Sequence, residues 1–221
     1  MAKKEKNEDY VLFDDIKLTP FQLDSLMELG NIGSGNAITA LSQLLNKTIR
    51  VSLTSVELIP FWKLPDEFGG REIEVFGILS HVEENQTLSI LQIYTKESVI
   101  NVINNLSDKS IDNIKEIRQL SDLDDIILST ITEVGNILSS HYANALADLL
   151  ETKLVPTVPN IAFDSLGAIM DSIVSRSAEH VDLMIMINTK MDIEDLDING
   201  ILVFLPAVDT LKSLFKTLNI E

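Results

Sequence analysis

Cysteine is absent from the 221 residues, and this absence excludes disulfide bonds and thiolate metal sites. Basic residues are also scarce: 17 lysines and arginines stand against 34 aspartates and glutamates, so the formal net charge is −17 at pH 7. Such a chain lacks the cationic surface that nucleic acids and anionic membranes require. Neither nucleic acid nor a membrane surface is therefore an expected partner.

Long hydrophobic runs are missing as well. The longest apolar stretch, near residues 181–187, is far too short to cross a bilayer, and the charged start MAKKEKNEDY lacks the apolar segment of a signal peptide. We expect a cytoplasmic protein without membrane insertion. Hydrophobic residues still make up 45% of the chain, which is enough to fill a large core. Residues 1–18 are predicted to be a polar N-terminal tail, and residues 19–221 a single domain.

A segment that begins at Asp24 recurs at Ser129, a shift of 129 − 24 = 105 residues. The two copies read DSLMELGNIGSGNAITALSQLL and STITEVGNILSSHYANALADLL. The carboxylate and carboxamide positions coincide in this register, Glu28 with Glu133 and Asn31 with Asn136. We interpret the chain as an internal duplication, with repeats over about residues 20–120 and 121–221.

Each copy of this helical segment is followed by three β-rich runs and a closing helical pattern, so each half reads α, β, β, β, α. Strands that cluster between helices, without strict alternation, are typical of an α+β fold. We expect a largely antiparallel sheet with helices packed on it and the two halves related by an approximate twofold axis. The acidic segment SDLDD, residues 121–125, is expected to cap and start the second motif helix.

Two faces can be distinguished on each motif helix. A period of 3.6 residues places one set of apolar side chains on a common buried stripe: Leu23, Leu26, Met27, Ile38, Leu41, Leu44 and Leu45. A second, outward stripe repeats in both copies: Asp24, Glu28, Asn31 and Gly35, then Ser129, Glu133, Asn136 and Ser140. Each helix thus presents a carboxylate and a carboxamide one turn apart, pointing the same way.

The glycines of the first copy lower the stability of the helix, because an interior glycine weakens a helix by roughly 1 kcal/mol relative to alanine. Their spacing, G-x-x-G-x-G with no preceding strand, differs from a phosphate-binding loop, so we expect no nucleotide site. We expect Gly30 and Gly135 to allow close packing inside the domain. Gly35, on the outward stripe, is expected to leave room for a partner that approaches Glu28 and Asn31.

The repeated arrangement, Asp or Ser, then x3-Glu-x2-Asn-x22-Pro, resembles the CheC-type phosphatases of chemotaxis, the CheC/CheX/FliY group. The second copy fits throughout, with Ser129, Glu133, Asn136 and Pro159. The first copy has Thr54 where the pattern expects proline. Two motifs in one domain are similar to CheC, since CheX-like members carry one motif and FliY-like members add a further domain.

The resemblance implies an α+β fold and a phosphatase that acts on the phospho-aspartate of the response regulator CheY. It implies that Asn31 and Asn136 orient the attacking water and that Glu28 and Glu133 anchor the partner. Mg²⁺ would be supplied by the bound regulator, and the deamidase CheD is a further implied partner. Asp24 and Ser129 are expected to support or start their helices, and Pro159 to shape the turn into a strand.

Other functions remain open at the level of the sequence. The protein could be a binding module that sequesters CheD or phosphorylated CheY without catalysis, or a structural duplication without activity. The recurrence of both asparagines favours catalysis, because a pure binder does not need them. His81, His141 and His180 do not cluster at metal-ligand spacing, so we expect neither a metal site nor a cofactor of the protein's own.

Overall fold

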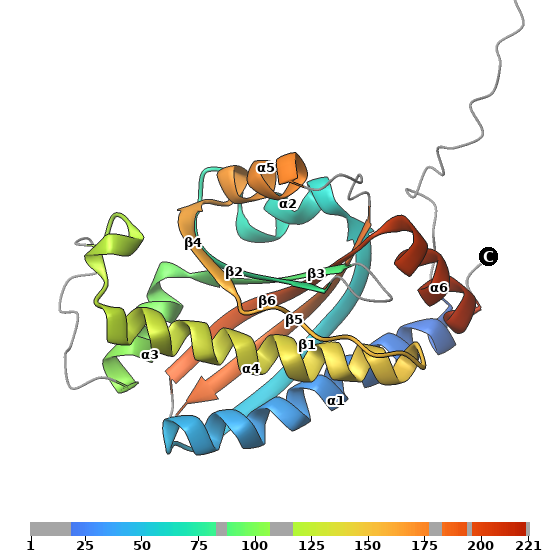
Figure 1. Ribbon diagram of the computed structural model, residues 1–221, viewed down its shortest axis with the longest axis horizontal. Coiled ribbons are helices and arrows are strands. Elements are labelled where there is room, and N and C mark those ends of the chain that lie inside the picture. The colour runs from blue at the N-terminus through green and yellow to red at the C-terminus, as the bar shows by residue number, and fades with distance from the viewer. Residues whose placement is uncertain (1–18, 83–87, 107–116, 177–182, 194–195, 220–221) are drawn as a thin grey trace, which may run out of the picture.

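The computed structural model describes residues 19–82, 88–106, 117–176, 183–193 and 196–219 (Figure 1). The tail predicted over residues 1–18 lies outside this part of the chain. The helices are α1 (Pro20–Leu45), α2 (Leu64–Phe68), α3 (Lys96–Leu106), α4 (Asp125–Leu149), α5 (Leu166–Arg176) and α6 (Val208–Leu218). The strands are β1 (Ile49–Pro60), β2 (Glu74–Val82), β3 (Leu88–Thr95), β4 (Asn160–Ser165), β5 (Leu183–Ile193) and β6 (Leu196–Pro206).

The strands form one six-stranded sheet in the order β1-β5-β6-β3-β2-β4, and every neighbouring pair is antiparallel. The α+β fold with an antiparallel sheet is therefore confirmed. When β1, β2 and β3 are exchanged with β4, β5 and β6, the strand order becomes its own reverse. The order thus has a twofold pattern centred between β6 and β3, whereas the origin of this pattern by duplication stays a prediction.

The first strand of each half pairs with the middle strand of the other half. β1 lies beside β5 along its whole length, from Ile49 opposite Ile193 to Pro60 opposite Leu183. β4 correspondingly lies beside β2. Because each half supplies an edge strand to the other, the halves are interleaved and do not form separate sheets.

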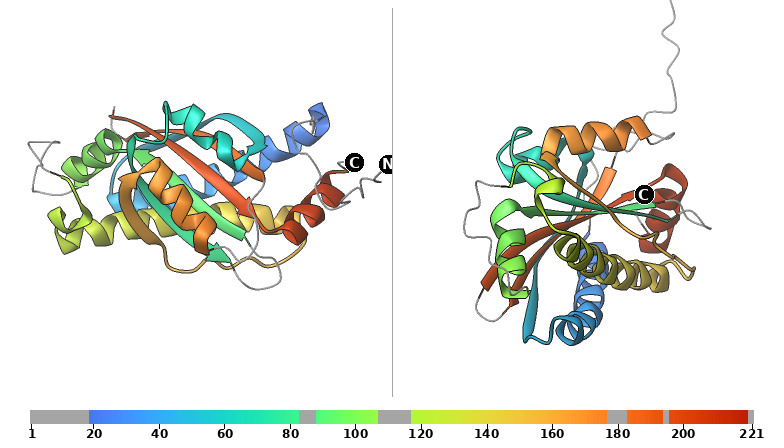
Figure 2. Two further views of the ribbon diagram at one scale, coloured as in Figure 1. Left: turned by 90° about the horizontal axis from the view of Figure 1, so that it is seen from above. Right: turned by 60° about the vertical axis from the view of Figure 1, so that its left-hand side comes forward.

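Helices cover both faces of the sheet, with α1 and α4 on one side and α2 and α5 on the other (Figures 1 and 2). The strands supply apolar side chains to both layers by simple alternation. In β5, Ile185 and Ile187 join the core under α1 and α4, and Met184 and Met186 join the core under α2 and α5. A strand covered on both faces reads as a continuous apolar run, which explains LMIMI in this sequence.

The expected order of one helix, three strands and one helix in each half was incomplete, because a helix follows the first strand in both halves. In the first half this is the short α2, and in the second it is α5. The signal for α5 is present in the sequence: its buried residues Leu166, Ile169, Met170 and Ile173 follow the helical period.

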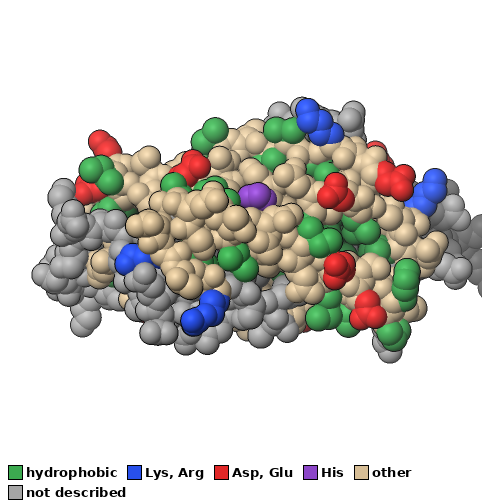
Figure 3. Space-filling view, turned by 90° about the horizontal axis from the view of Figure 1, so that it is seen from below, with side chains coloured by type: hydrophobic (Ala, Val, Ile, Leu, Met, Phe, Trp, Pro, Cys, Tyr) green, Lys and Arg blue, Asp and Glu red, His purple; other side chains and the backbone are tan. Residues whose placement is uncertain are grey.

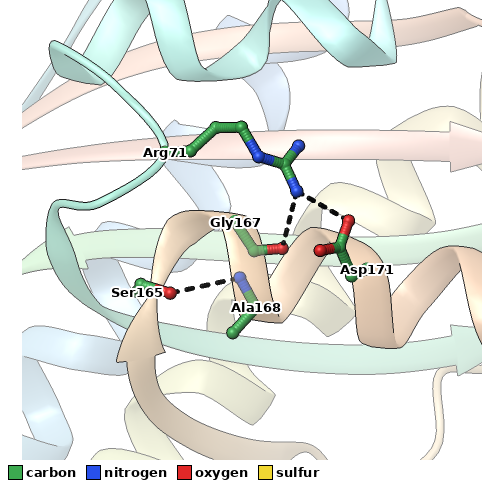
Figure 4. Close-up of polar contacts among 5 residues, drawn as sticks. All are labelled: Arg71, Ser165, Gly167, Ala168 and Asp171. Atoms are coloured by element: carbon green, nitrogen blue, oxygen red, sulfur yellow. Dashed lines mark hydrogen bonds and ion pairs between the residues drawn. The ribbon is translucent and has the colours of Figure 1, made fainter.

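Polar contacts anchor the start of α5 to the opposite half of the chain (Figure 4). Ser165 accepts a hydrogen bond from the backbone N–H of Ala168 at 3.2 Å. Arg71, just before β2, donates to the Gly167 carbonyl oxygen and to the Asp171 carboxylate, at 3.4 and 2.7 Å. The missed helix is thus capped locally and held by a residue 100 positions away in the sequence.

Candidate functional site

The two motif helices begin at residues whose side chains cap them. Thr19 caps α1 in a capping box with Gln22, and Asp124 caps α4 by accepting from the N–H of Ile127 at 2.9 Å. The prediction that residues 121–125 cap and start the second helix is confirmed. Asp24 and Ser129 are each the fifth residue of their helices, so neither starts a helix; that they support their helices stays a prediction.

The helices α1 and α4 run in opposite directions and pack on each other (Figure 1). At their contact, a Cβ atom built on Gly33 would lie 2.6 Å from Cδ1 of the buried Tyr142 ring. Ser34 and Tyr142 join the helices by a hydrogen bond of 2.6 Å, and Ser34 also donates to the Gly30 carbonyl oxygen at 2.7 Å. A glycine is required at residue 33 because the tyrosine ring occupies the space that a side chain would need.

At the two positions that correspond to Gly33 and Tyr142, the small and the large residue are exchanged. The shift of 105 relates Gly33 to Leu138 and Ala37 to Tyr142, and all four are buried. Gly33 thus lies against the large ring of Tyr142, whereas the corresponding positions hold Leu138 and Ala37. Both pairs of positions are buried, although the residues that fill them differ.

The outward stripe is exposed throughout in α1, whereas in α4 Asn136 and Ser140 are half-buried. Glu28, Asn31 and Glu133 are exposed, and Asn136 is half-buried. Within the part of the chain that the structure describes, none of these four side chains makes a hydrogen bond or ion pair. Both carboxylates and both carboxamides are therefore available to a partner.

The buried stripe of α1 is correct at its centre and wrong near its end. Leu26 and Leu41 are almost fully buried, and Leu23, Met27 and Ile38 are half-buried. Leu44, in the last turn of α1, is however 45% exposed. The side chain of Leu45 lies outside the described residues.

Two glycines of the motif helices allow close packing, and a third leaves open space on the surface. A Cβ atom on Gly135 would lie 2.6 Å from Cγ2 of Ile78, so this glycine lets α4 lie directly on β2. Gly30 is buried, which agrees with a packing role. Gly35 is exposed and has no atom within 4 Å of the position that a Cβ would take. Open space beside Glu28 and Asn31 is thus present, as the sequence predicted.

A buried polar network beneath α4 was not predicted from the sequence. Gln92 of β3 donates to the Gly135 carbonyl oxygen at 2.7 Å and to Ser139 Oγ at 2.8 Å. Ser80 donates to Ser139 at 3.1 Å, and the Tyr94 hydroxyl donates to Gln92 Oε1 at 3.1 Å. These bonds hold the helix on either side of residue 136. The available signal was a lone glutamine in the apolar run LSILQIY.

The motif proline and its replacement lie in different backbone settings. Pro159 is buried and immediately precedes β4, in agreement with its expected role in the turn into a strand. Thr54 lies within β1, where the pairing steps from Leu53 opposite Thr189 to Ser55 opposite Asn188. Thr54 is therefore the extra residue of a β-bulge, a setting in which a strand tolerates proline and other residues alike.

The face that carries α1 is shown from below in Figure 3. Its middle is mostly tan, the colour of backbone and of uncharged polar side chains, with one purple histidine; green hydrophobic side chains are scattered across the face, and red acidic ones lie toward its two ends. In the described ranges there is no group of three or more side chains that could hold a metal ion. Nor does any described helix combine the length and hydropathy needed to cross a membrane.

Comparison with known proteins identifies the family. Residues 21–52 and 126–162 match the model of the CheC-like family. The CheY-P phosphatase CheC of Bacillus subtilis (strain 168) is 30% identical over 202 residues, which cover 89% of this chain and 93% of that protein. The chain belongs to the CheC-like family. The two matched segments begin 126 − 21 = 105 residues apart, the same shift that relates the two motifs.

Solved structures share the fold of this CheC-like protein. FliY of Thermotoga maritima matches with a TM-score of 0.66 and 21% identity, over 91% of this chain and 98% of that one. The chain matched in the CheX–CheY–BeF3–Mg²⁺ complex from Borrelia burgdorferi gives a TM-score of 0.50 at 13% identity, over 82% and 97% of the two chains. At these identities the likeness extends to the fold alone.

Proposed function

We propose that this CheC-like protein accelerates hydrolysis of the phospho-aspartate on a CheY-type response regulator. The observation that supports this most is the pair of outward stripes, in which Glu28 with Asn31 and Glu133 with Asn136 recur 105 residues apart and lack partners within the described protein. The relative from B. subtilis is a CheY-P phosphatase, and a fold neighbour is known in complex with CheY, BeF3 and Mg²⁺.

The chemistry needs little from this chain. An aspartyl phosphate is an activated acyl phosphate, and in hydrolysis a water oxygen bonds to phosphorus while the bond from phosphorus to the aspartate oxygen breaks. The aspartate leaves as a carboxylate, and the proton of the water passes to phosphate or solvent. The Mg²⁺ held by the regulator would neutralise the phosphoryl oxygens, so what remains is to place the water in line.

A carboxamide suits this task. Its oxygen accepts a hydrogen bond from the water and its NH₂ group donates one to a phosphoryl oxygen, with no dependence on protonation state. Asn31 and Asn136 would each position a water in this way, and positioning alone can contribute several kcal/mol to lowering a barrier. Neither carboxamide has a hydrogen-bond partner among the described residues, so both of its groups are free for the task.

Glu28 and Glu133 would anchor the regulator. Each lies three residues before its asparagine, so the two side chains leave the helix on one face about 5–6 Å apart. A lysine of the regulator beside its phosphorylation site would pair with the carboxylate. An ion pair of this kind is weak on a free surface but gains strength when docking removes water from it.

The test is the decay of phosphorylated CheY from the same organism, in the presence of Mg²⁺. Wild-type protein is expected to speed the decay. Asn31→Ala and Asn136→Ala should each retain the activity of one site. With the double variant, the regulator should lose its phosphoryl group at its spontaneous rate. Glu28→Gln in the Asn136→Ala background should raise KM, and Glu67→Gln, on the exposed surface of α2, is the matched control.

The alternative is that the protein acts by sequestering CheD or the phosphorylated regulator. That function predicts tight binding without any acceleration of decay, and equal behaviour of wild-type protein and the double asparagine variant. If this result is obtained, the asparagines serve recognition alone and the proposed phosphatase activity is wrong.

A further inference from the structure

Two large apolar side chains are exposed to solvent at equivalent positions of the two motif helices. Phe21 and Ile126 are each the second residue of their helix, and 126 − 21 = 105 is the shift that relates the motifs. Phe21 is 67% exposed and Ile126 is 70% exposed. In the described helices α1–α6, no other large hydrophobic side chain is as exposed as these two.

Both side chains lie on the same stripe as the motif residues. Each precedes its glutamate by seven residues, which is two helical turns to within about 20° and a rise of about 10 Å. Phe21 therefore extends the line through Glu28 and Asn31, and Ile126 extends the line through Glu133 and Asn136.

The local backbone is also alike in the two copies. The carbonyl oxygen of Phe21 accepts a hydrogen bond from Ser25 Oγ at 3.0 Å, and that of Ile126 from Thr130 Oγ1 at 2.9 Å. The two positions thus share helix register, exposure and side-chain-to-backbone bonding. An apolar side chain repeated under these conditions favours a partner that contacts both copies in the same way.

We propose that Phe21 and Ile126 are the apolar anchors of the two docking surfaces for the response regulator. The inference rests on the proposed function, because the occupant is the same regulator whose phospho-aspartate faces the asparagine. It requires that the regulator carry an exposed apolar side chain about 10 Å from the residue that pairs with the glutamate. Burial of the anchor sets affinity and lies too far from the reacting atoms to alter chemistry.

The test separates the two sites by silencing one asparagine at a time. Phe21→Ala is made in the Asn136→Ala background and Ile126→Ala in the Asn31→Ala background, and KM and kcat are measured with phosphorylated regulator. Each substitution is expected to raise KM about tenfold and to change kcat by less than about twofold. Phe21→Leu and Ile126→Leu should restore most of the affinity, and Val174→Ala, at an exposed position of α5, is the matched control.

A binding measurement tests the two anchors even if the protein has no phosphatase activity. The Kd of the regulator loaded with Mg²⁺ and beryllofluoride is expected to rise at least tenfold in the Phe21→Ala/Ile126→Ala double variant. A wild-type protein that binds but does not speed decay would overturn the proposed phosphatase activity alone. Unchanged Kd in the double variant, or a loss confined to kcat, would overturn the anchors alone.

Self-association is the competing occupant of these surfaces. Analytical ultracentrifugation of the wild-type protein and the double variant distinguishes it from regulator docking. The anchors predict the same sedimentation for both proteins in the absence of regulator. A wild-type dimer that the double variant abolishes would assign Phe21 and Ile126 to contacts between copies of this chain and overturn the proposal.

Discussion

At the scale of single residues, the glycines of α1 have opposite environments although they lie in one short run. Gly33 faces the ring of Tyr142, which is itself buried and packs edge-on against Phe204 at a centroid distance of 6.5 Å. Gly35, two residues later, faces open space. The same substitution in the same helix should therefore have effects of opposite sign.

Gly33→Ala is expected to destabilise the protein by about 1–3 kcal/mol, because the new methyl group would overlap a ring that cannot move freely. Gly35→Ala is expected to stabilise it by about 0.5–1 kcal/mol, because alanine restricts the unfolded chain and favours the helix. Urea unfolding of both variants measures the difference. Equal stabilisation by the two changes would contradict the contact between Gly33 and Tyr142.

At the scale of elements, the contact between α1 and α4 and the support of α4 by β3 determine where the asparagines lie. The contact depends on Tyr142, and the support on Gln92. The two side chains act on different sides of α4, one toward its partner helix and the other toward the sheet. Their effects can therefore be tested separately.

Burial raises the pKa of the Tyr142 hydroxyl to about 12, and burial likewise raises the pKa of Tyr94. Since the folded pKa exceeds the unfolded value of about 10, this stabilisation is complete below pH 10 and is lost as the pH rises through 12. In Tyr142→Phe the free energy of unfolding should fall less steeply from pH 10 to 12. At pH 7 the variant should lose about 0.5–1.5 kcal/mol with the Ser34 bond. Urea unfolding at both ends of this range checks the sign, and identical pH slopes for the two proteins would refute it.

Gln92→Leu would leave the Tyr94 hydroxyl without its acceptor and would leave Ser139 with the bond from Ser80 alone. We expect a loss of about 2–3 kcal/mol in the free energy of unfolding. Because the network holds α4 beside residue 136, kcat should fall further in the Asn31→Ala background, which reports the second site, than in the Asn136→Ala background. Equal losses at both sites would show that Gln92 acts on stability without positioning Asn136.

At the scale of the whole molecule, the halves of the chain depend on each other. β1 pairs only with β5 among the described strands, and α1 packs on α4, so a first half alone would lack both neighbours. The second half alone would lack β2, the partner of β4. Because of this interleaving, both halves of the chain are needed to form the sheet.

Residues 1–116 and 117–221 expressed separately are therefore expected to show no cooperative thermal transition. Each fragment would expose an unpaired strand and an uncovered apolar helix face. Co-expressed fragments should associate and recover the circular dichroism and phosphatase activity of the intact chain. A fragment that melts cooperatively alone would show that one repeat suffices for folding.

Local properties explain what the sequence determined by itself. The helical period placed Glu28 and Asn31 on an outward stripe, and the repeat placed Glu133 and Asn136 on a second one. The acidic segment 121–125 predicted the start of α4, where Asp124 is the capping residue. The strand runs predicted an antiparallel sheet, because alternation and turns depend on neighbouring residues. These features need no knowledge of distant contacts.

The tertiary structure alone decided which half of the chain supplies each neighbour. Three contacts join residues about 40 to more than 130 positions apart in the sequence. They are the pairing of β1 with β5, the ring of Tyr142 against Gly33, and the hydrogen bonds of Gln92 beneath α4. The exposure of Leu44, which the helical period places on the buried stripe, is likewise a property of the folded molecule. Such contacts result from packing between elements, whose choice depends on the whole chain and not on the period of any one segment.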